Sequence, residues 1–187
     1  MQQAKYQDEI QMLSSKNNDT ADEKLVEAIK ENNHDAFKIL YYRYFQKLIR
    51  YAYYRLHSVE TARDLVQELF FRVWTGRERL NPQKSIKAYL YKSLNNLIIN
   101  HLKLSSSKTS SLTEIDERKI KIEEIQDNRI DIQNIIKKLP EKLKTVFILS
   151  RVEGYKYSEI AEICNISVKA VEKRMTKVFV LLRENIE

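Results

Sequence analysis

The chain has 187 residues and a formal net charge of +7, and its 2 glycines and 2 prolines leave few residues for tight turns. These counts argue against an all-β fold and favour long helices. A single cysteine, Cys164, rules out an intramolecular disulfide, and neither a signal-peptide core nor an apolar run of membrane-spanning length is present, so a cytoplasmic protein without membrane insertion is expected.

Residues 1–19 are polar and aperiodic and are predicted to form a disordered tail. Helices are expected over about 22–32 and 34–57. Apolar and aromatic residues recur in the second helix at three- and four-residue spacing, which predicts a buried stripe. Its many tyrosines, between residues 41 and 54, also allow a base-stacking surface. The core interpretation is the favoured one.

A third helix is predicted over about 58–77, with a buried stripe running from Ala62 to Val73. The opposite side of this helix carries Asp64, Gln67, Glu68 and Phe71. An apolar ring beside two carboxylates in a basic protein indicates a docking face for another protein. Periodicity alone equally allows Phe71 to pack under a neighbouring helix.

Gly76 and Pro82 interrupt the pattern, which predicts a basic loop over 76–85, followed by a helix to about residue 104 that Ser85 can cap. Amides can read base edges and lysines can bind phosphates, although the same side chains would also suit an ordinary surface. The loop and the helix carry such cations and amides at Lys84, Lys87, Lys92, Asn95, Asn96, Asn100 and Lys103.

A small polar run, residues 105–111, opens a segment to residue 131 that is predicted to be a flexible linker. A helix is expected over about 131–138. Pro140 suits the first turn of the next helix, and Gly154 is expected at its C-terminal end.

Residues 158–175 have the pattern of a helix-turn-helix, a motif that places its second helix in the major groove of DNA. Ala161 is small enough for close helix packing, and Asn165 suits a turn residue with positive φ. Ser167 can cap the second helix. An apolar stripe from Val168 to Leu182 is predicted to be buried. Lysines four residues apart form a ridge opposite the stripe: Lys169, Lys173 and Lys177.

Catalytic chemistry has no signature in this sequence. The three histidines and the cysteine lack metal-ligand spacing, and two glycines 78 positions apart cannot form a glycine-rich phosphate loop. The sequence therefore predicts no enzyme, no metal site and no cofactor.

Several motifs resemble the extracytoplasmic-function (ECF) sigma factors of bacteria, which act in transcription regulation. ARDLVQELFFRVW (62–74) resembles the second-region signature of this family, and DAFKILYYRY (35–44) looks like the start of that region. KAYLYK (87–92) with Asn96 resembles its promoter-reading helix. LPEKLKTVF (139–147) and EGYKYSEIA (153–161) resemble the fourth region, which ends in a helix-turn-helix.

The resemblance implies an all-α fold of two small helical domains joined by the flexible linker. A domain at 20–104 would bind the clamp of RNA polymerase core and the −10 promoter element, and a helix-turn-helix domain at 132–187 would bind the −35 element. The third-helix face at Asp64, Gln67, Glu68 and Phe71 would dock on polymerase. Trp74 occupies a position that is normally aromatic in the family, either as packing or as a melting wedge.

The same resemblance assigns DNA contacts and a further partner. For the −35 element, the base-reading candidates are Lys173 and Thr176, with Glu172 as a further possibility. Lys169, Arg174 and Lys177 are expected to contact phosphates, and an anti-sigma factor is expected to regulate the protein. The full −35 set is Ser167, Lys169, Glu172, Lys173, Arg174, Thr176 and Lys177. The full −10 set is Lys84, Ser85, Lys87, Asn95, Asn96, Asn100 and Lys103. A flipped −10 base would sit in the loop pocket near Asn96 and Asn100.

Two other hypotheses are compatible with the helix-turn-helix alone. A stand-alone transcriptional regulator would bind duplex DNA tightly without polymerase, whereas a sigma factor binds weakly by itself. A helical adaptor with basic faces would show no salt-sensitive DNA binding. The third-helix signature favours the sigma factor.

Overall fold

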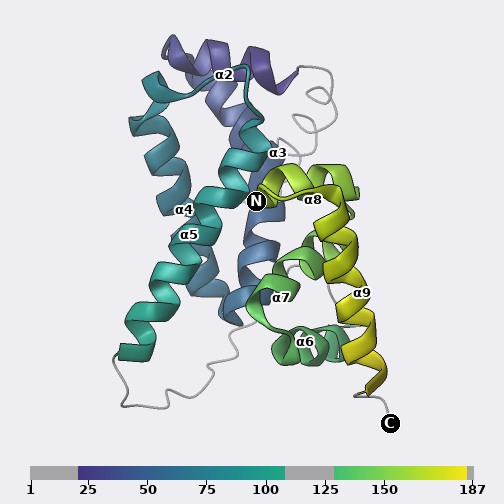
Figure 1. The fold of residues 1–187 in the computed structure, drawn as a ribbon. Coiled ribbons are helices and arrows are strands. Elements are labelled where there is room, and N and C mark those ends of the chain that lie inside the picture. The colour runs from purple at the N-terminus through teal and green to yellow at the C-terminus, as the bar shows by residue number, and fades with distance from the viewer. Residues whose placement is uncertain (1–20, 108–128, 185–187) are drawn as a thin grey trace.

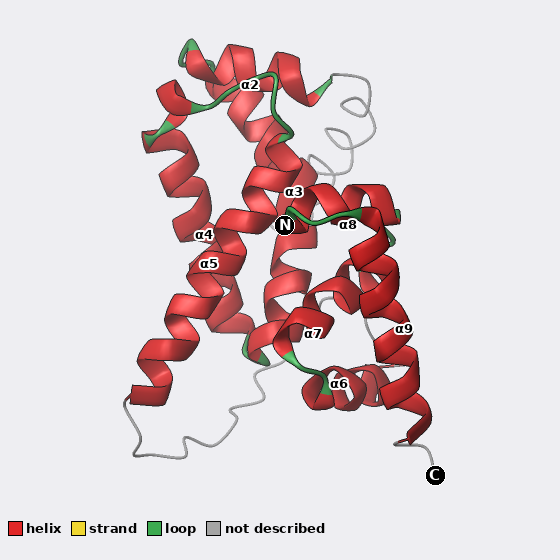
Figure 2. Cartoon of the chain, viewed as in Figure 1, coloured by secondary structure: helices red, strands yellow, loops and turns green. Residues whose placement is uncertain are grey.

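The computed structural model describes residues 21–107 and 129–184, and every regular element in these two ranges is helical (Figures 1 and 2). The predicted tail and most of the predicted linker lie outside the described residues. The all-α prediction is confirmed. The helices are α2 (Asp22–Lys30), α3 (His34–Leu56), α4 (Val59–Thr75), α5 (Ile86–Ser107), α6 (Arg129–Lys138), α7 (Glu141–Phe147), α8 (Tyr157–Cys164) and α9 (Val168–Glu184).

Side-chain caps explain where the N-terminal helices begin. The Asn33 side chain accepts a hydrogen bond from the Ala36 backbone at 2.9 Å, and Ser58 Oγ accepts one from Thr61 at 3.2 Å. Such caps satisfy N–H groups that a first helical turn leaves unpaired. At the end of α3, His57 adopts a left-handed conformation with φ 57°, which turns the chain into α4.

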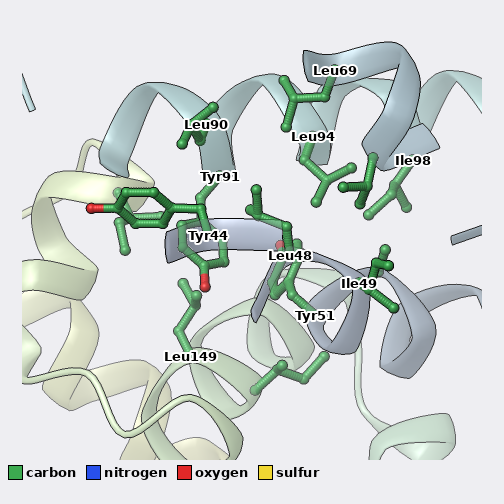
Figure 3. Packing of buried hydrophobic residues seen from close by; sticks show 14 of the residues in the cluster. Tyr44, Leu48, Ile49, Tyr51, Leu69, Leu90, Tyr91, Leu94, Ile98 and Leu149 are labelled. Carbon is green, nitrogen blue, oxygen red and sulfur yellow. The ribbon is translucent and has the colours of Figure 1, made fainter. Parts of the chain in front are cut away.

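Helix α3 forms the centre of the N-terminal half, residues 21–107, and packs against α2, α4 and α5. Tyr44, Tyr51 and Tyr54 are buried on it, which supports the core interpretation of the tyrosine stripe. The Tyr44 hydroxyl donates to Asp22 of α2, and Arg43 pairs with the same carboxylate. Figure 3 shows Leu48 and Tyr51 facing Leu94 of α5 within this core.

The C-terminal half, residues 129–184, contains α6 to α9 and one feature that the sequence pattern missed. A π-helical turn, η2 (Ile148–Val152), continues α7, and the Glu153 backbone N–H donates to the Ile148 carbonyl at 3.0 Å. Gly154 ends this turn with φ +74°, a conformation that glycine adopts without steric cost. Pro140 is the N-cap of α7 and precedes its first turn. The predicted stripe of α9 is buried at Val171, Met175 and Val178, but Val168 is 42% exposed at the start of the helix.

The two halves pack against each other. Helix α8 contacts α5, and η2 contacts α3. In Figure 1, α3 lies between the α4–α5 pair and the C-terminal helices. Leu149 of η2 is fully buried and belongs to the same hydrophobic cluster as Tyr44 and Tyr51 of α3, all of which are labelled in Figure 3. We refer to this packing of the C-terminal half on α3 and α5 as the closed arrangement.

Candidate nucleic-acid interface

The turn between α8 and α9 has the predicted backbone. Asn165 ends α8 in the left-handed region with φ 51°, and the Ile166 N–H donates to the Ala161 carbonyl at 2.9 Å. Ser167 Oγ accepts a hydrogen bond from Ala170 N–H at 3.2 Å and so caps α9. Together these contacts fix the angle at which α9 leaves α8, and they confirm the predicted turn geometry.

Replacing Asn165 tests this turn directly. Asn165→Val is expected to lower the free energy of unfolding by about 1–2 kcal/mol, because a β-branched residue is strained at positive φ. Asn165→Gly is expected to be neutral or slightly stabilising, since glycine adopts this conformation freely. Urea unfolding followed by circular dichroism measures both variants. Equal stability of the valine and glycine variants would contradict the account.

Most of the predicted −35 set lies on one exposed side of α9. Ser167, Lys169, Glu172, Lys173, Thr176 and Lys177 are all exposed. The Thr176 hydroxyl donates to the Glu172 carbonyl at 3.0 Å, which leaves its oxygen lone pairs available as acceptors. Arg174 differs from the rest, because it is half-buried and lines a cleft toward the N-terminal half.

The loop between α4 and α5 borders a cavity of about 840 Å³. Lys84 and Ser85 of the predicted −10 set line it, and so do Tyr89 and Lys92 of α5. Ser85 Oγ accepts a hydrogen bond from Ala88 N–H at 3.1 Å, as its predicted capping role requires. Glu162 and Asn165 of the helix-turn-helix also line the cavity, so this loop faces the C-terminal half.

The rest of the predicted −10 set lies further along α5. Asn95, Asn96 and Lys103 line a second cavity, about 610 Å³, between α5 and the C-terminal half. We call this second cavity the cleft. Asn100 is exposed and lines neither cavity. Asn96 and Asn100 therefore lie away from the loop cavity in which a flipped base was expected.

Polar contacts connect the two halves. Lys87 of the −10 set pairs with Glu159 of α8, and its ammonium lies 4.9 Å from the centre of the Tyr155 ring. Arg50 of α3 makes a two-pronged pair with Glu153, with both N–O distances 2.8 Å. The Tyr91 and Tyr155 hydroxyls lie 3.2 Å apart.

A fourth connection is centred on Arg55, near the end of α3. Its guanidinium donates to Tyr51 and Asn95 in the N-terminal half, at 3.1 and 2.8 Å. It also donates to Thr145 at 3.1 Å and pairs with Glu141 at 2.5 Å, both in α7. Asn95 of the −10 set is thus tied to the C-terminal half through one arginine.

The surroundings of the ionisable groups at these contacts raise the pKa of some groups and lower the pKa of others. Burial raises the pKa of Glu153, against the opposing effect of the hydrogen bonds and charge of Arg50. The hydrogen bond from Lys87 lowers the pKa of Glu159. Burial lowers the pKa of His57, and the nearby charges of Lys137 and Lys144 lower it further.

The predicted docking face is exposed along α4. Asp64, Gln67 and Glu68 are exposed, and Phe71 is 67% exposed, so this ring is not covered by a neighbouring helix. Glu68 pairs with Arg72 at 2.5 Å one turn later. Trp74 is half-buried against Phe37, with ring centres 5.0 Å apart, and Arg77 lies 4.6 Å from its ring centre. These contacts favour packing as the role of Trp74.

Residues 21–107 and 129–184 contain neither a metal-ligand cluster nor a helix that could cross a membrane. No group of three or more histidine, cysteine or acidic residues could hold a metal ion there. No helix in those ranges combines the length and hydropathy needed to cross a membrane.

Sequence reasoning missed Arg55 and the contacts between the halves. Arg55 had a recognisable signal, because it follows Leu48, Tyr51 and Ala52 on the apolar side of α3. Glu141, Glu153 and Glu159 had none, since a glutamate in a charged helical sequence is indistinguishable from a solvated one.

Comparison with known proteins gives two family matches. Residues 40–107 match the model of Sigma-70 region 2, and residues 129–181 match that of Sigma-70 region 4. The RNA polymerase sigma factor YlaC of Bacillus subtilis is 26% identical in an alignment of 166 residues that covers 81% of this chain and 92% of YlaC. The ECF RNA polymerase sigma factor SigW of the same organism is 26% identical in an alignment of 170 residues that covers 81% of this chain and 89% of SigW.

A solved structure has a similar fold. The sigma factor RpoE of Bartonella quintana, in complex with the anti-sigma factor NepR, superimposes with a TM-score of 0.63 at 18% identity. The similarity covers 79% of this chain and 94% of RpoE.

Proposed function

The chain belongs to the ECF sigma factors, and from this premise we propose that it is held closed in its free form and reads a promoter only after binding RNA polymerase core. Its function is that of an alternative sigma factor, which binds core, recognises −35 and −10 elements and promotes initiation. Membership of this family implies an initiation factor and not an enzyme. We place its action in the cytoplasm, and an anti-sigma factor is its expected regulator.

One observation carries the proposal: three of the −10 side chains of α5, Asn95, Asn96 and Lys103, line the cleft between α5 and the C-terminal half. Elements centred about 10 and 35 base pairs upstream of a start site lie roughly 85 Å apart along B-DNA, at about 3.4 Å per base pair. Helices α5 and α8 are in direct contact in the closed arrangement. The closed form is therefore unable to contact both elements on one duplex.

Several proposed DNA contacts are also engaged within the protein. Lys87 pairs with Glu159, and Asn95 accepts a hydrogen bond from Arg55. Arg174 lines the cleft. In contrast, the α4 face at Asp64, Gln67, Glu68 and Phe71 is exposed, so core can dock without prior opening. This supports an order in which core binds first and the DNA surfaces are exposed second.

Binding assays test this order. Purified protein is titrated onto a promoter fragment alone, and then together with core polymerase. We expect at least 100-fold tighter specific binding with core, a difference of about 2.7 kcal/mol. Tight, sequence-specific binding by the chain alone would instead establish a stand-alone regulator.

The Arg50–Glu153 pair tests the closed arrangement. The Glu153 side chain is fully buried and that of Arg50 is 34% exposed, so the two partners are not equivalent. Arg50→Gln leaves a buried carboxylate without its cation and is expected to destabilise the closed arrangement by about 3 kcal/mol. Glu153→Gln leaves an arginine that can reach water and is expected to cost about 1 kcal/mol.

Small-angle X-ray scattering at pH 7.5 measures how far each variant opens. We expect a larger radius of gyration for Arg50→Gln than for Glu153→Gln. The increase in the radius of gyration of Arg50→Gln over that of wild type should become smaller as the pH is lowered. A group whose pKa is raised in the closed form favours that form at low pH, and removing the cation raises the pKa of Glu153 further. Identical scattering from both variants and wild type would contradict the closed arrangement as described.

A further inference from the structure

Arg55 is buried in a place that is unusual for a charged side chain. Only 5% of the residue is exposed, although it lies close to the end of α3. Its guanidinium has partners in both halves: Tyr51 and Asn95 on one side, Glu141 and Thr145 on the other. Its Nε is buried and has no hydrogen-bond partner among the described residues.

If the two halves separate, Arg55 keeps its partners in the N-terminal half and loses its partners in the C-terminal half. Tyr51 and Asn95 stay with Arg55, because all three belong to the N-terminal half. Glu141 and Thr145 leave with α7, which removes the only carboxylate paired with this arginine in the described residues. The guanidinium then borders the surface of α5 that carries Asn95, and it has a free charge and free donors.

The cleft that Arg55 lines is rich in cations. Lys92 and Lys103 of α5 lie on the N-terminal wall, and Lys142 and Arg174 lie on the opposite wall. Among the residues that the structure describes, Glu141 is the one acidic residue that lines it. A guanidinium binds carboxylate and phosphate with the same geometry, so Glu141 occupies the position that a phosphate would take.

We propose that Arg55 is a DNA-contacting residue of this sigma factor: in the open form it binds a backbone phosphate of the unpaired −10 strand, and in the closed form Glu141 and Thr145 of α7 occupy it. The inference rests on the proposed function, since it requires a promoter strand on α5. It adds to the −10 set a residue that comes from α3, outside the loop and helix that the sequence pattern indicated.

A variant of Arg55 would also disturb the closed arrangement, so the test uses a background in which Arg55 has already lost its partners in α7. Glu141→Ala with Thr145→Val removes both of these partners and leaves Arg55 unchanged. In this background, Arg55→Gln is compared with Arg50→Gln, which removes a cation of α3 that does not line the cleft. Holoenzyme is formed with core, and its affinity for a forked promoter template with an unpaired −10 strand is measured by fluorescence anisotropy over a range of salt concentrations.

The background itself should bind the template at least as tightly as wild type. Arg55→Gln is expected to lower its affinity about tenfold, as for the loss of a charge-assisted hydrogen bond. Its salt slope should fall by roughly 0.7, since one single-strand phosphate contact is lost. Arg50→Gln should change neither quantity. Equal affinity of the Arg55 and Arg50 variants would overturn the inference, because Arg55 would then act only between the halves.

Thermal melting and core binding show whether each variant is folded. If Arg55→Gln does not fold, Arg55→Lys is measured in its place. Lysine keeps the positive charge but cannot donate two parallel hydrogen bonds to one phosphate. About a threefold loss of affinity with an unchanged salt slope is then expected, and no loss would overturn the inference. A wild-type chain that adds no template binding to core would overturn the proposed function, and this inference with it.

Discussion

Glu68→Lys combined with Phe71→Ala is expected to weaken binding to RNA polymerase core by roughly 30-fold or more. Phe71 is 67% exposed on α4, and Glu68 lies one turn earlier on the same face. A large apolar side chain of this kind, when it anchors an interface, contributes about 2 kcal/mol or more, which corresponds to a 30-fold change in affinity. The fold should remain intact, because neither side chain belongs to the core and the Glu68–Arg72 pair is exposed.

A matched control separates the docking face from general surface effects. Glu27→Lys in α2 with Leu104→Ala in α5 repeats the charge reversal and the loss of an exposed apolar side chain elsewhere on the N-terminal half. This control should bind core as wild type does in a quantitative pull-down. Unchanged affinity of the Glu68/Phe71 variant would remove the α4 face from the account.

Lys173→Ala combined with Thr176→Ala is expected to reduce transcription from a −35-dependent promoter by about 10- to 100-fold, while core binding is unchanged. Both residues are exposed on α9, at positions from which a helix in the major groove can reach base edges. One good base contact is worth about 1–3 kcal/mol of discrimination. The variant should therefore respond little to base changes in the −35 element.

The neighbouring lysines provide the contrasting variant. Lys169→Ala with Lys177→Ala should weaken binding to all −35 sequences alike and lower the salt slope by about one per contact. If this lysine pair changed base preference and the Lys173/Thr176 pair did not, the assignment of base and phosphate contacts on α9 would be reversed.

The turn and most helix ends were predictable from the sequence, because they depend on residues only a few positions apart in the chain. Asn165 and Ser167 determine the turn through their own conformations and a hydrogen bond three residues away. The expected bounds of α2 to α6 fall within three residues of the structure, for example 107 against about 104 at the end of α5. The helix expected to run from Pro140 to Gly154 is an α-helix only as far as Phe147 and continues as the π-helical turn η2. Phe71 illustrates the limit, since its spacing gave equal support to an exposed and a packed position.

The arrangement of the two halves was not predictable, since it depends on partners far apart in the chain. Arg50 and Glu153 are 103 positions apart, and Lys87 and Glu159 are 72 apart. Each of these residues has the sequence context of a solvated surface charge. Arg174, predicted to contact a phosphate of the −35 element, lines the cleft in the closed arrangement. The roles of individual DNA-contacting side chains stay predictions.

Run-off transcription tests the central claim most directly. Purified core polymerase is supplied with a pool of promoter fragments, with and without the protein, and start sites are mapped. We expect protein-dependent transcripts from defined start sites that share −35 and −10 sequences. Absence of such transcripts, together with salt-sensitive, sequence-specific binding of DNA by the chain alone, would contradict the account.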